Sequence, residues 1–236
     1  YCQAEYAREK AKQLRIHTRK DFVENELRQS HEYRQLIANS IYFPNDYVLN
    51  LSRELKLLSI PGAVLNGDEL MQVRKLAESI EKIFRWFDAE RRQVYGGLLK
   101  IIDGTYYEKV IIELIDDVLD EYGQVKDSAS DELRNIRMSL YRKRNELRKV
   151  FEKIISKLNK AGYLADIEES FMNGRRVVAI FAEQKRTVKG ILHGESDSRK
   201  TSFIEPEETI ELNNQVHELE NAEKKEVYRI LRELTS

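Results

Sequence analysis

The segment from Asp131 to Lys160 contains no proline or glycine, and it constrains the fold of this chain more than any other. Its apolar residues recur in alternating steps of three and four, with Lys143 at one interrupted position: Leu133, Ile136, Leu140, Leu147, Val150 and Ile154. This spacing predicts one long helix with a heptad seam, about 45 Å in length at about 1.5 Å per residue. Ser130 is the predicted N-cap, with two acidic residues beside the positive end of the helix dipole.

The pattern changes after Gly162, where three runs rich in β-forming residues appear at 177–182, 187–192 and 201–204. Polar turns at 183–186 and 194–200 separate them, so we expect a small antiparallel sheet of about three strands. Pro206 is expected as the first residue of a new helix. That helix has an apolar stripe of its own: Leu212, Val216, Leu219, Val227, Ile230 and Leu234. The simplest architecture is an antiparallel helical hairpin with a β tip at its far end.

The first half of the chain is predicted to be a helical base. Helical spacing covers about 4–39 with a break near 17–20, then 49–58, 66–95 and 106–118. Asn66 and Glu69 have the spacing of a capping box, and Gly96-Gly97 predicts a break or kink. The fold class is therefore mostly α with a small inserted antiparallel β-sheet. The predicted division is 1–125 helical base, 126–162 first long helix, 163–206 β unit and 207–236 returning helix.

Composition narrows the class of protein. Charged residues make up 34% and apolar residues 41%, with only 10 Gly and 3 Pro, which favours long helices with few turns. The single cysteine, Cys2, excludes an intramolecular disulfide and a cysteine-based zinc site, so a reducing, cytoplasmic location is expected. No segment has the apolar length of a membrane span. The sequence starts and ends within helical patterns, which suggests a piece of a longer protein.

Charge is unevenly distributed although the net charge is only −1. Residues 134–160 hold ten Lys/Arg and two acids, whereas 205–233 hold nine acids and four Lys/Arg. Two interpretations remain open. The two helices are hairpin partners with complementary flanks, or the basic helix also faces phosphate groups.

The β unit carries a second basic cluster. A small basic sheet on a long helical arm suits sequence-independent phosphate binding, and its serines and threonine can donate hydrogen bonds to phosphate. The alternatives are an ordinary solvated surface for the cations and simple turn formation for the hydroxyls. The candidate nucleic-acid-binding residues are Arg175, Arg176, Lys185, Arg186, Lys189, Ser196, Ser198, Arg199, Lys200 and Thr201.

Enzyme chemistry is not apparent. The sequence has no Gly-x-x-x-x-Gly-Lys-Ser/Thr loop and no His-Glu-x-x-His motif, so no catalytic residue, cofactor or metal site is expected in it. The lone His193 is interpreted as structural, and Trp86 as a core residue rather than a base-stacking one. The acidic residues at 116–117 and 120–121 are read as an exposed helix end rather than a metal pair.

Several motifs nevertheless resemble one family. They occur in the same order as in the MutS family, in its second bacterial branch, which lacks the mismatch-recognition domain. The clamp-to-lever junction is similar in Lys189-Gly190-Ile191-Leu192-His193, Ser196-Asp197-Ser198, Thr201, Phe203-Ile204-Glu205-Pro206 and Glu211-Leu212-Asn213-Asn214. The start of the lever helix is similar in Val125, Asp127-Ser128-Ala129-Ser130, Leu133 and Ile136-Arg137. A stretch of the core domain is similar in Ile60-Pro61-Gly62-Ala63-Val64-Leu65 and Asp68-Glu69-Leu70.

The chain also departs from the family pattern. The first clamp strand usually carries a Pro and a Lys, where this chain has Ala179 to Gln184. Gly194 stands where an Asp usually follows the His, and Arg199 where a Gly usually follows the second Ser.

The resemblance implies core, lever and clamp regions of a dimeric ATPase that clasps DNA, with ATP and Mg bound C-terminal to this region. It also implies mismatched or branched DNA as ligand, suppression of recombination, or contact with ribosomal RNA in the rescue of collided ribosomes. Two other classes stay open: a helical coiled-coil module that binds another protein, and an enzyme with an unrecognised site.

Overall fold

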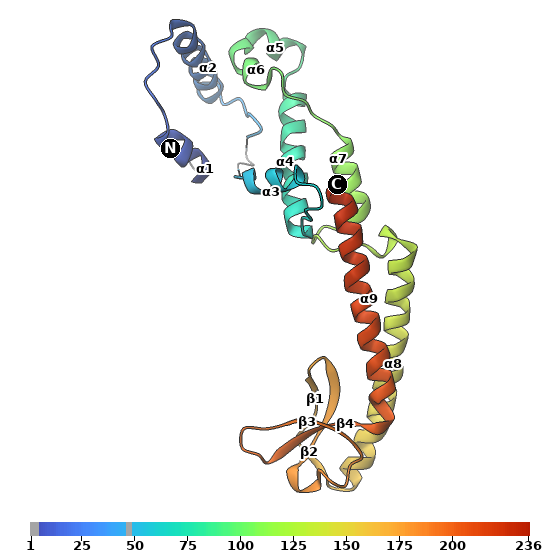
Figure 1. Cartoon of the computed structure of the whole chain (residues 1–236). Helices are drawn as coiled ribbons and strands as arrows, with labels where there is room; N and C mark the ends of the chain where they lie inside the picture. Colours follow the sequence, from blue (N-terminus) through green and yellow to red (C-terminus); the bar gives the residue numbers. More distant parts are fainter. Residues whose placement is uncertain (1–4, 46–48) are drawn as a thin grey trace. The chain divides into compact units, whose positions relative to one another are not determined.

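The computed structural model describes residues 5–45 and 49–236 (Figure 1). The chain divides into two compact units. One comprises residues 1–126 together with 231–236, and the other runs from Asp127 to Ile230. The predicted start of the first helix at residue 4 lies outside the described residues. In the described part of the chain, every helix is too short or too polar to cross a lipid bilayer.

The first unit is built from helices. They are α1 (Glu5–Lys12), α2 (Lys20–Ala38), α3 (Ser52–Leu58), α4 (Gly67–Trp86), α5 (Ala89–Val94), α6 (Gly96–Ile102) and α7 (Val110–Val118), followed by an isolated β-bridge between Leu119 and Val125. The final residues of α9 (Ile210–Thr235) complete the unit.

Two predictions at the ends of α4 have different outcomes. The capping box is confirmed, since the Asn66 side chain accepts from the Glu69 N–H and the Glu69 carboxylate accepts from the Asn66 N–H, both at 2.9 Å. The predicted continuous helix over 66–95 is wrong, because α4 ends at Trp86. The Asp88 carboxylate accepts from the Arg91 N–H at 2.8 Å and starts α5 as a new helix.

The core of this unit is aromatic. Trp86 and Phe87 pack with Phe43, and the Trp86 indole N–H donates to the Tyr42 carbonyl at 2.8 Å, so the interpretation of Trp86 as a core residue is confirmed. The buried Glu32 carboxylate accepts from the N–H groups of Gly97 and Leu98 at the start of α6. A Cβ at Gly97 would come within 2.9 Å of that carboxylate, which explains the glycine there.

The second unit contains the predicted long helix, α8 (Asp131–Lys160), preceded by a 3-10 turn at Asp127–Ala129. Ser130 is its N-cap, as predicted, and accepts from the Leu133 N–H at 2.9 Å. Helices α8 and α9 lie side by side and antiparallel (Figure 1), joined by Arg137–Glu223 and Arg144–Glu220 at 2.7 Å each. These pairs confirm the interpretation of complementary flanks.

The predicted seam of α8 is correct up to Leu147 and again at Ile154, which packs against the core cluster, but it is wrong at Val150. The buried residues are Leu133, Leu140, Leu147, Phe151 and Leu158, so Phe151 replaces Val150. Phe151 and Leu158 belong to a cluster that also contains Val178, Ile180 and Ile204 of the sheet and Val216 of α9. Since the seam is covered within this chain, Leu140 and Leu147 are not free to bind another protein.

The sheet has four antiparallel strands rather than about three, in the order β1-β2-β4-β3. They are β1 (Leu164–Met172), β2 (Arg175–Phe181), β3 (Gly190–Glu195) and β4 (Thr201–Pro206). The missed strand β1 is joined to β2 by Asn173 and Gly174, whose φ angles are +52° and +75°. Two positive φ values define a type I′ hairpin turn, for which Asn-Gly is the preferred sequence. That dipeptide is the signal from which β1 could have been found.

Pro206 does not begin a helix. It is the last residue of β4 and is followed by a 3-10 turn, Glu207–Thr209, before α9 starts at Ile210. Residues Val177 to Ile180 of β2 are fully buried, because β2 is a central strand and packs against the helical hairpin. The sheet thus lies at the end of the hairpin where α8 ends and α9 begins.

Candidate nucleic-acid interface

Two connections of the sheet meet at one end of its strands. The Ala182 N–H donates to the Lys200 carbonyl at 2.9 Å, and Lys185 forms an ion pair with Glu195 at 2.8 Å. The loop after β2 therefore lies beside the β3–β4 hairpin. This brings together four exposed basic residues from the predicted set, hereafter the loop cations: Lys185, Arg186, Arg199 and Lys200.

The loop cations differ in how far their charge is neutralised. The hydrogen bond from Lys185, and then its charge, hold the pKa of the Glu195 carboxyl below its usual value, and the charge of Arg199 contributes. Among the described residues, Arg186 and Lys200 have no ion-pair partner. Glu183 and Asp197 lie in the same loops and are exposed, so four cations stand beside three acids and the loop end keeps a positive excess of one.

The hydroxyl residues build the turn that carries these cations. The Ser196 hydroxyl accepts from the Thr201 N–H at 3.1 Å and lies 3.3 Å from the Ser198 hydroxyl. The Arg199 N–H donates to the Ser196 carbonyl at 2.7 Å, and Arg199 has a φ of +57°, a conformation that favours glycine. The Ser196 hydroxyl thus takes part in the turn, while contacts of Ser196, Ser198 and Thr201 with phosphate stay a prediction.

Lys189 lies apart from the loop cations. It precedes β3, whose first residue Gly190 pairs with Pro206 at the opposite end of the strand from Glu195. There Lys189 lines a hollow of about 590 Å³ with Lys157 of α8, Glu207 and Glu208. The structure therefore groups Lys189 with helix α8 rather than with the loops.

Arg175 and Arg176 are held by partners inside the protein. Arg175 donates to Glu205 at 2.9 Å and to the Asn214 side chain at 2.6 Å. Arg176 makes two hydrogen bonds of 2.9 Å to Glu169, and its guanidinium stacks 4.9 Å from the centre of the Phe151 ring. Both arginines thus fix the sheet to the helices, and neither adds a free charge to the surface.

A buried polar cluster surrounds Glu205, whose side chain has no exposed surface. Besides Arg175, its carboxylate contacts the Nε2 of His193 at 2.7 Å and accepts from the Asn213 side chain at 2.9 Å. Asn213 also exchanges hydrogen bonds of 3.2 Å with the N–H and carbonyl of Arg176, where β4 no longer pairs with β2. The interpretation of His193 as structural agrees with this cluster, which joins the sheet to α9.

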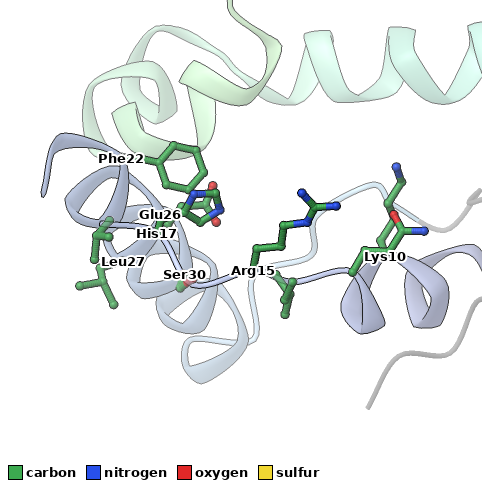
Figure 2. A pocket seen from close by; sticks show the side chains of 10 residues that line it. Lys10, Arg15, His17, Phe22, Glu26, Leu27 and Ser30 are labelled. Carbon is green, nitrogen blue, oxygen red and sulfur yellow. The ribbon is translucent and has the colours of Figure 1, made fainter. Parts of the chain in front are cut away.

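The first unit contains an open hollow of about 530 Å³ between α1, the following linker and α2 (Figure 2). Figure 2 shows Phe22, His17 and Glu26 grouped on the α2 side, with Arg15 and Lys10 further along the linker and α1. Its lining side chains are mostly exposed, and Leu14 is 80% exposed. The hollow has no enclosed polar group that would define a ligand site.

Acidic residues near α7 have structural partners. Asp116 accepts two hydrogen bonds from Arg74, one of them at 2.9 Å, and this pairing holds the pKa of the Asp116 carboxyl below its usual value. Asp120 accepts from the N–H groups of Tyr122 and Gln124. Within the described residues, no group of three or more His, Cys, Asp or Glu is placed to hold a metal ion.

Comparison with known proteins gives relatives of one name. No protein-family model matches the chain. Endonuclease MutS2 of Aquifex aeolicus is 28% identical over 235 residues, which cover 100% of this chain and 30% of the relative. Endonuclease MutS2 of Halothermothrix orenii is 30% identical over 222 residues, or 91% and 28% of the two chains. That of Geobacillus thermodenitrificans is 32% identical over 198 residues, or 83% and 25%. The chain spans about a quarter to a third of the length of these relatives.

Proposed function

We propose that this chain is the DNA-holding arm of a MutS2-like protein related to DNA repair and recombination. Similarity to the MutS2 relatives at 28–32% identity over most of the chain supports a family of this kind. The arm grips nucleic acid through the β-sheet and performs no catalysis by itself. The preferred ligands are branched or mismatched DNA, and the arm does not read base sequence.

The observation that carries this proposal is the cluster of loop cations. Four exposed basic side chains lie on adjacent loops at one end of the sheet, beside three acids, Glu183, Glu195 and Asp197. Among the described residues, Arg186 and Lys200 have no ion-pair partner. Exposed cations on loops bind phosphate oxygens, which are the same for every base sequence. The loops present no aromatic side chain for base stacking, which favours contact with the backbone over recognition of bases.

The helical hairpin gives these loops a rigid support. Fully buried Glu205 and Asn213, with Arg175, tie the sheet to α9, and Arg176 stacks on Phe151 of α8. A rigid mounting keeps the loop cations in a fixed arrangement, so little order must be gained on binding.

The larger protein is part of the proposal. It binds ATP and Mg in a region outside this chain, forms a homodimer and uses the arm to clasp DNA. Contact with ribosomal RNA during rescue of collided ribosomes is the alternative use of the same cations.

The test is a binding series with the full chain. Fluorescence anisotropy would measure its affinity for a four-way junction, a duplex and a single strand of DNA between 50 and 200 mM salt. A loop variant would carry Arg186→Gln, Arg199→Gln and Lys200→Gln. We expect junction-preferring binding whose salt slope falls by about 0.9 in the loop variant for each phosphate contact removed.

The matched control changes three exposed lysines outside the sheet, Lys100, Lys224 and Lys225, to Gln. It has the same net charge as the loop variant. If both variants lower the affinity equally, net charge rather than the loops determines binding, and the proposal fails. A ribosomal RNA fragment added as a fourth ligand would separate the two uses, because preferential RNA binding supports the ribosome alternative.

A further inference from the structure

The ten basic residues of α8 separate into two sets in the structure. One set has ion-pair partners on α8, on α9 or in the preceding turn: Arg134, Arg137, Lys143, Arg144 and Arg148. The other set is exposed and, within the described residues, has no ion-pair partner: Arg142, Lys149, Lys153, Lys157 and Lys160. In the first set, Arg137 and Arg144 join α8 to α9, whereas the charges of the second set face solvent.

The exposed set forms a single stripe. Its members are separated by seven, four, four and three residues, and at 3.6 residues per turn all five fall within an arc of about 80°. The buried residues of the seam, such as Leu140 and Phe151, lie on the opposite side of the helix. From Arg142 to Lys160 the stripe is about 27 Å long at about 1.5 Å per residue. We call these five residues the basic stripe.

The charge of the basic stripe is not balanced by nearby acids. Glu146 is the acid whose position falls within the same arc, and it is paired with Lys143 at 3.0 Å. Glu152 lies outside the arc, next to Arg148 at 3.7 Å. At the sheet end the stripe continues to Lys189, which lines the same hollow as Lys157, although Glu207 and Glu208 border that hollow.

We propose that the basic stripe binds the phosphate backbone of a nucleic-acid duplex. It is a second site, on the helix rather than on the loops, and so goes beyond the function proposed above. A duplex carries about one negative charge per 1.7 Å of its axis, so a row of cations about 27 Å long meets phosphates along its whole length. The stripe requires no particular base sequence.

The composition of the arc distinguishes this ligand from two others. Its positions between Arg142 and Lys160 include no aromatic side chain, whereas single strands are held by stacking of bases on aromatic rings. The same positions include no apolar residue, whereas protein interfaces have an apolar and aromatic centre. A duplex, with its phosphates outside and its bases inside, fits a purely cationic surface.

The test uses the full chain and three variants. The stripe variant changes Arg142, Lys149, Lys153, Lys157 and Lys160 to Gln, a good helix former, so α8 is retained. The matched control changes five exposed lysines elsewhere to Gln and alters the net charge equally: Lys56, Lys75, Lys100, Lys224 and Lys225. The loop variant described above is the third, and circular dichroism at 222 nm verifies the helix content of each.

Binding would be measured by anisotropy between 50 and 200 mM salt. The probes are a 20-base-pair DNA duplex, an RNA duplex of the same sequence, a 20-nucleotide single strand and polyglutamate. We expect the duplex salt slope to fall in the stripe variant by about 0.9 for each phosphate contacted, hence by up to about 4.5, and to stay unchanged in the control. If the stripe variant loses equal affinity for the DNA and the RNA duplex, binding through the backbone alone is supported. If it loses affinity for only one of them, the stripe is supported and that duplex is its ligand.

Four results would overturn the proposal. Two are equal losses of duplex affinity in the stripe variant and the control, and a larger loss of affinity for the single strand than for the duplex. The others are no duplex binding by the unmodified chain at 50 mM salt, and stripe-dependent binding of polyglutamate in preference to the duplex. The loop variant distinguishes the two proposals. If only the loop variant loses duplex affinity, the stripe is refuted and the loop site is supported. If only the stripe variant loses it, the stripe is supported and the loop site is refuted.

Discussion

Arg175→Met tests whether the buried polar cluster fastens the sheet to the helical hairpin. The substitution removes the guanidinium that contacts Glu205 at 2.9 Å and leaves a carboxylate with no exposed surface and no arginine partner. Breaking a buried ion pair in this way costs about 3–5 kcal/mol. His193 and Asn213 still contact the same carboxylate, so we expect the lower end of that range, about 3 kcal/mol.

The assay must report on the sheet itself. Trp86, the single tryptophan, belongs to the other unit, so its fluorescence does not follow unfolding of the sheet. Native-state amide hydrogen exchange at Val177 to Ile180 of β2 does, because these residues are fully buried and their strand pairs with β1 on one side and β4 on the other. A loss of about 3 kcal/mol in the free energy of opening speeds exchange there by somewhat more than 100-fold.

Two controls make the result specific. Arg142→Met removes an exposed arginine without an ion pair from α8 and should leave exchange in β2 unchanged. Adding Glu205→Leu to Arg175→Met removes the stranded carboxylate, and protection should return in part, because the buried charge is gone although His193 and Asn213 lose a contact. The reasoning is refuted if Arg175→Met alone slows or barely changes exchange, with a loss below about 1 kcal/mol.

Three further predictions follow from single contacts. The hydrogen bond from Arg229, followed by that from Ser130, lowers the pKa of Glu226 to about 2 from its ordinary 4.5. The ionised Glu226 therefore stabilises the folded state fully above about pH 4.5, and this contribution is lost as the pH falls toward 2. Urea unfolding between pH 2 and 6 should show that the free energy of unfolding falls less steeply toward low pH in Glu226→Gln than in the unmodified chain. The same pH dependence in both would contradict this role of Glu226. Gly190→Ala would place a Cβ 2.1 Å from the Glu205 carbonyl and should destroy amide protection in β3, whereas the control Gly194→Ala meets only the flexible end of Met172 at 3.2 Å. Arg199→Gly should raise the free energy of unfolding of the second unit by up to about 1 kcal/mol by relieving a φ of +57°, and an equal gain in Lys200→Gly would refute this cause.

The sequence was sufficient to predict an element where all the residues that define it lie within one segment. Helix α8 has no Gly or Pro, a repeating apolar step and a serine N-cap, and the sequence predicted its bounds. The capping box at Asn66 is equally local, since all its partners lie within three residues. The Asn-Gly turn before β2 was also available in the sequence, although the strand preceding it was not predicted.

One of the positions where prediction failed depends on partners far along the chain. Phe151 rather than Val150 is buried in α8, in a cluster that includes Val178 and Ile204 of the sheet. The helix predicted over 66–95 breaks for a local reason instead, since Asp88 caps a new helix through the Arg91 N–H, and the apolar spacing alone does not reveal this.

The sequence by itself determined the class of this protein: two long helices of opposite charge, with a small basic sheet inserted between them. Only the tertiary structure decided which of its cations are available to a ligand. Arg175 and Arg186 look alike in the sequence, yet the first is paired with Glu205, 30 residues away, and the second lies exposed in a loop. The physical reason is that an ion pair depends on distance in space, and the fold alone brings such distant residues together.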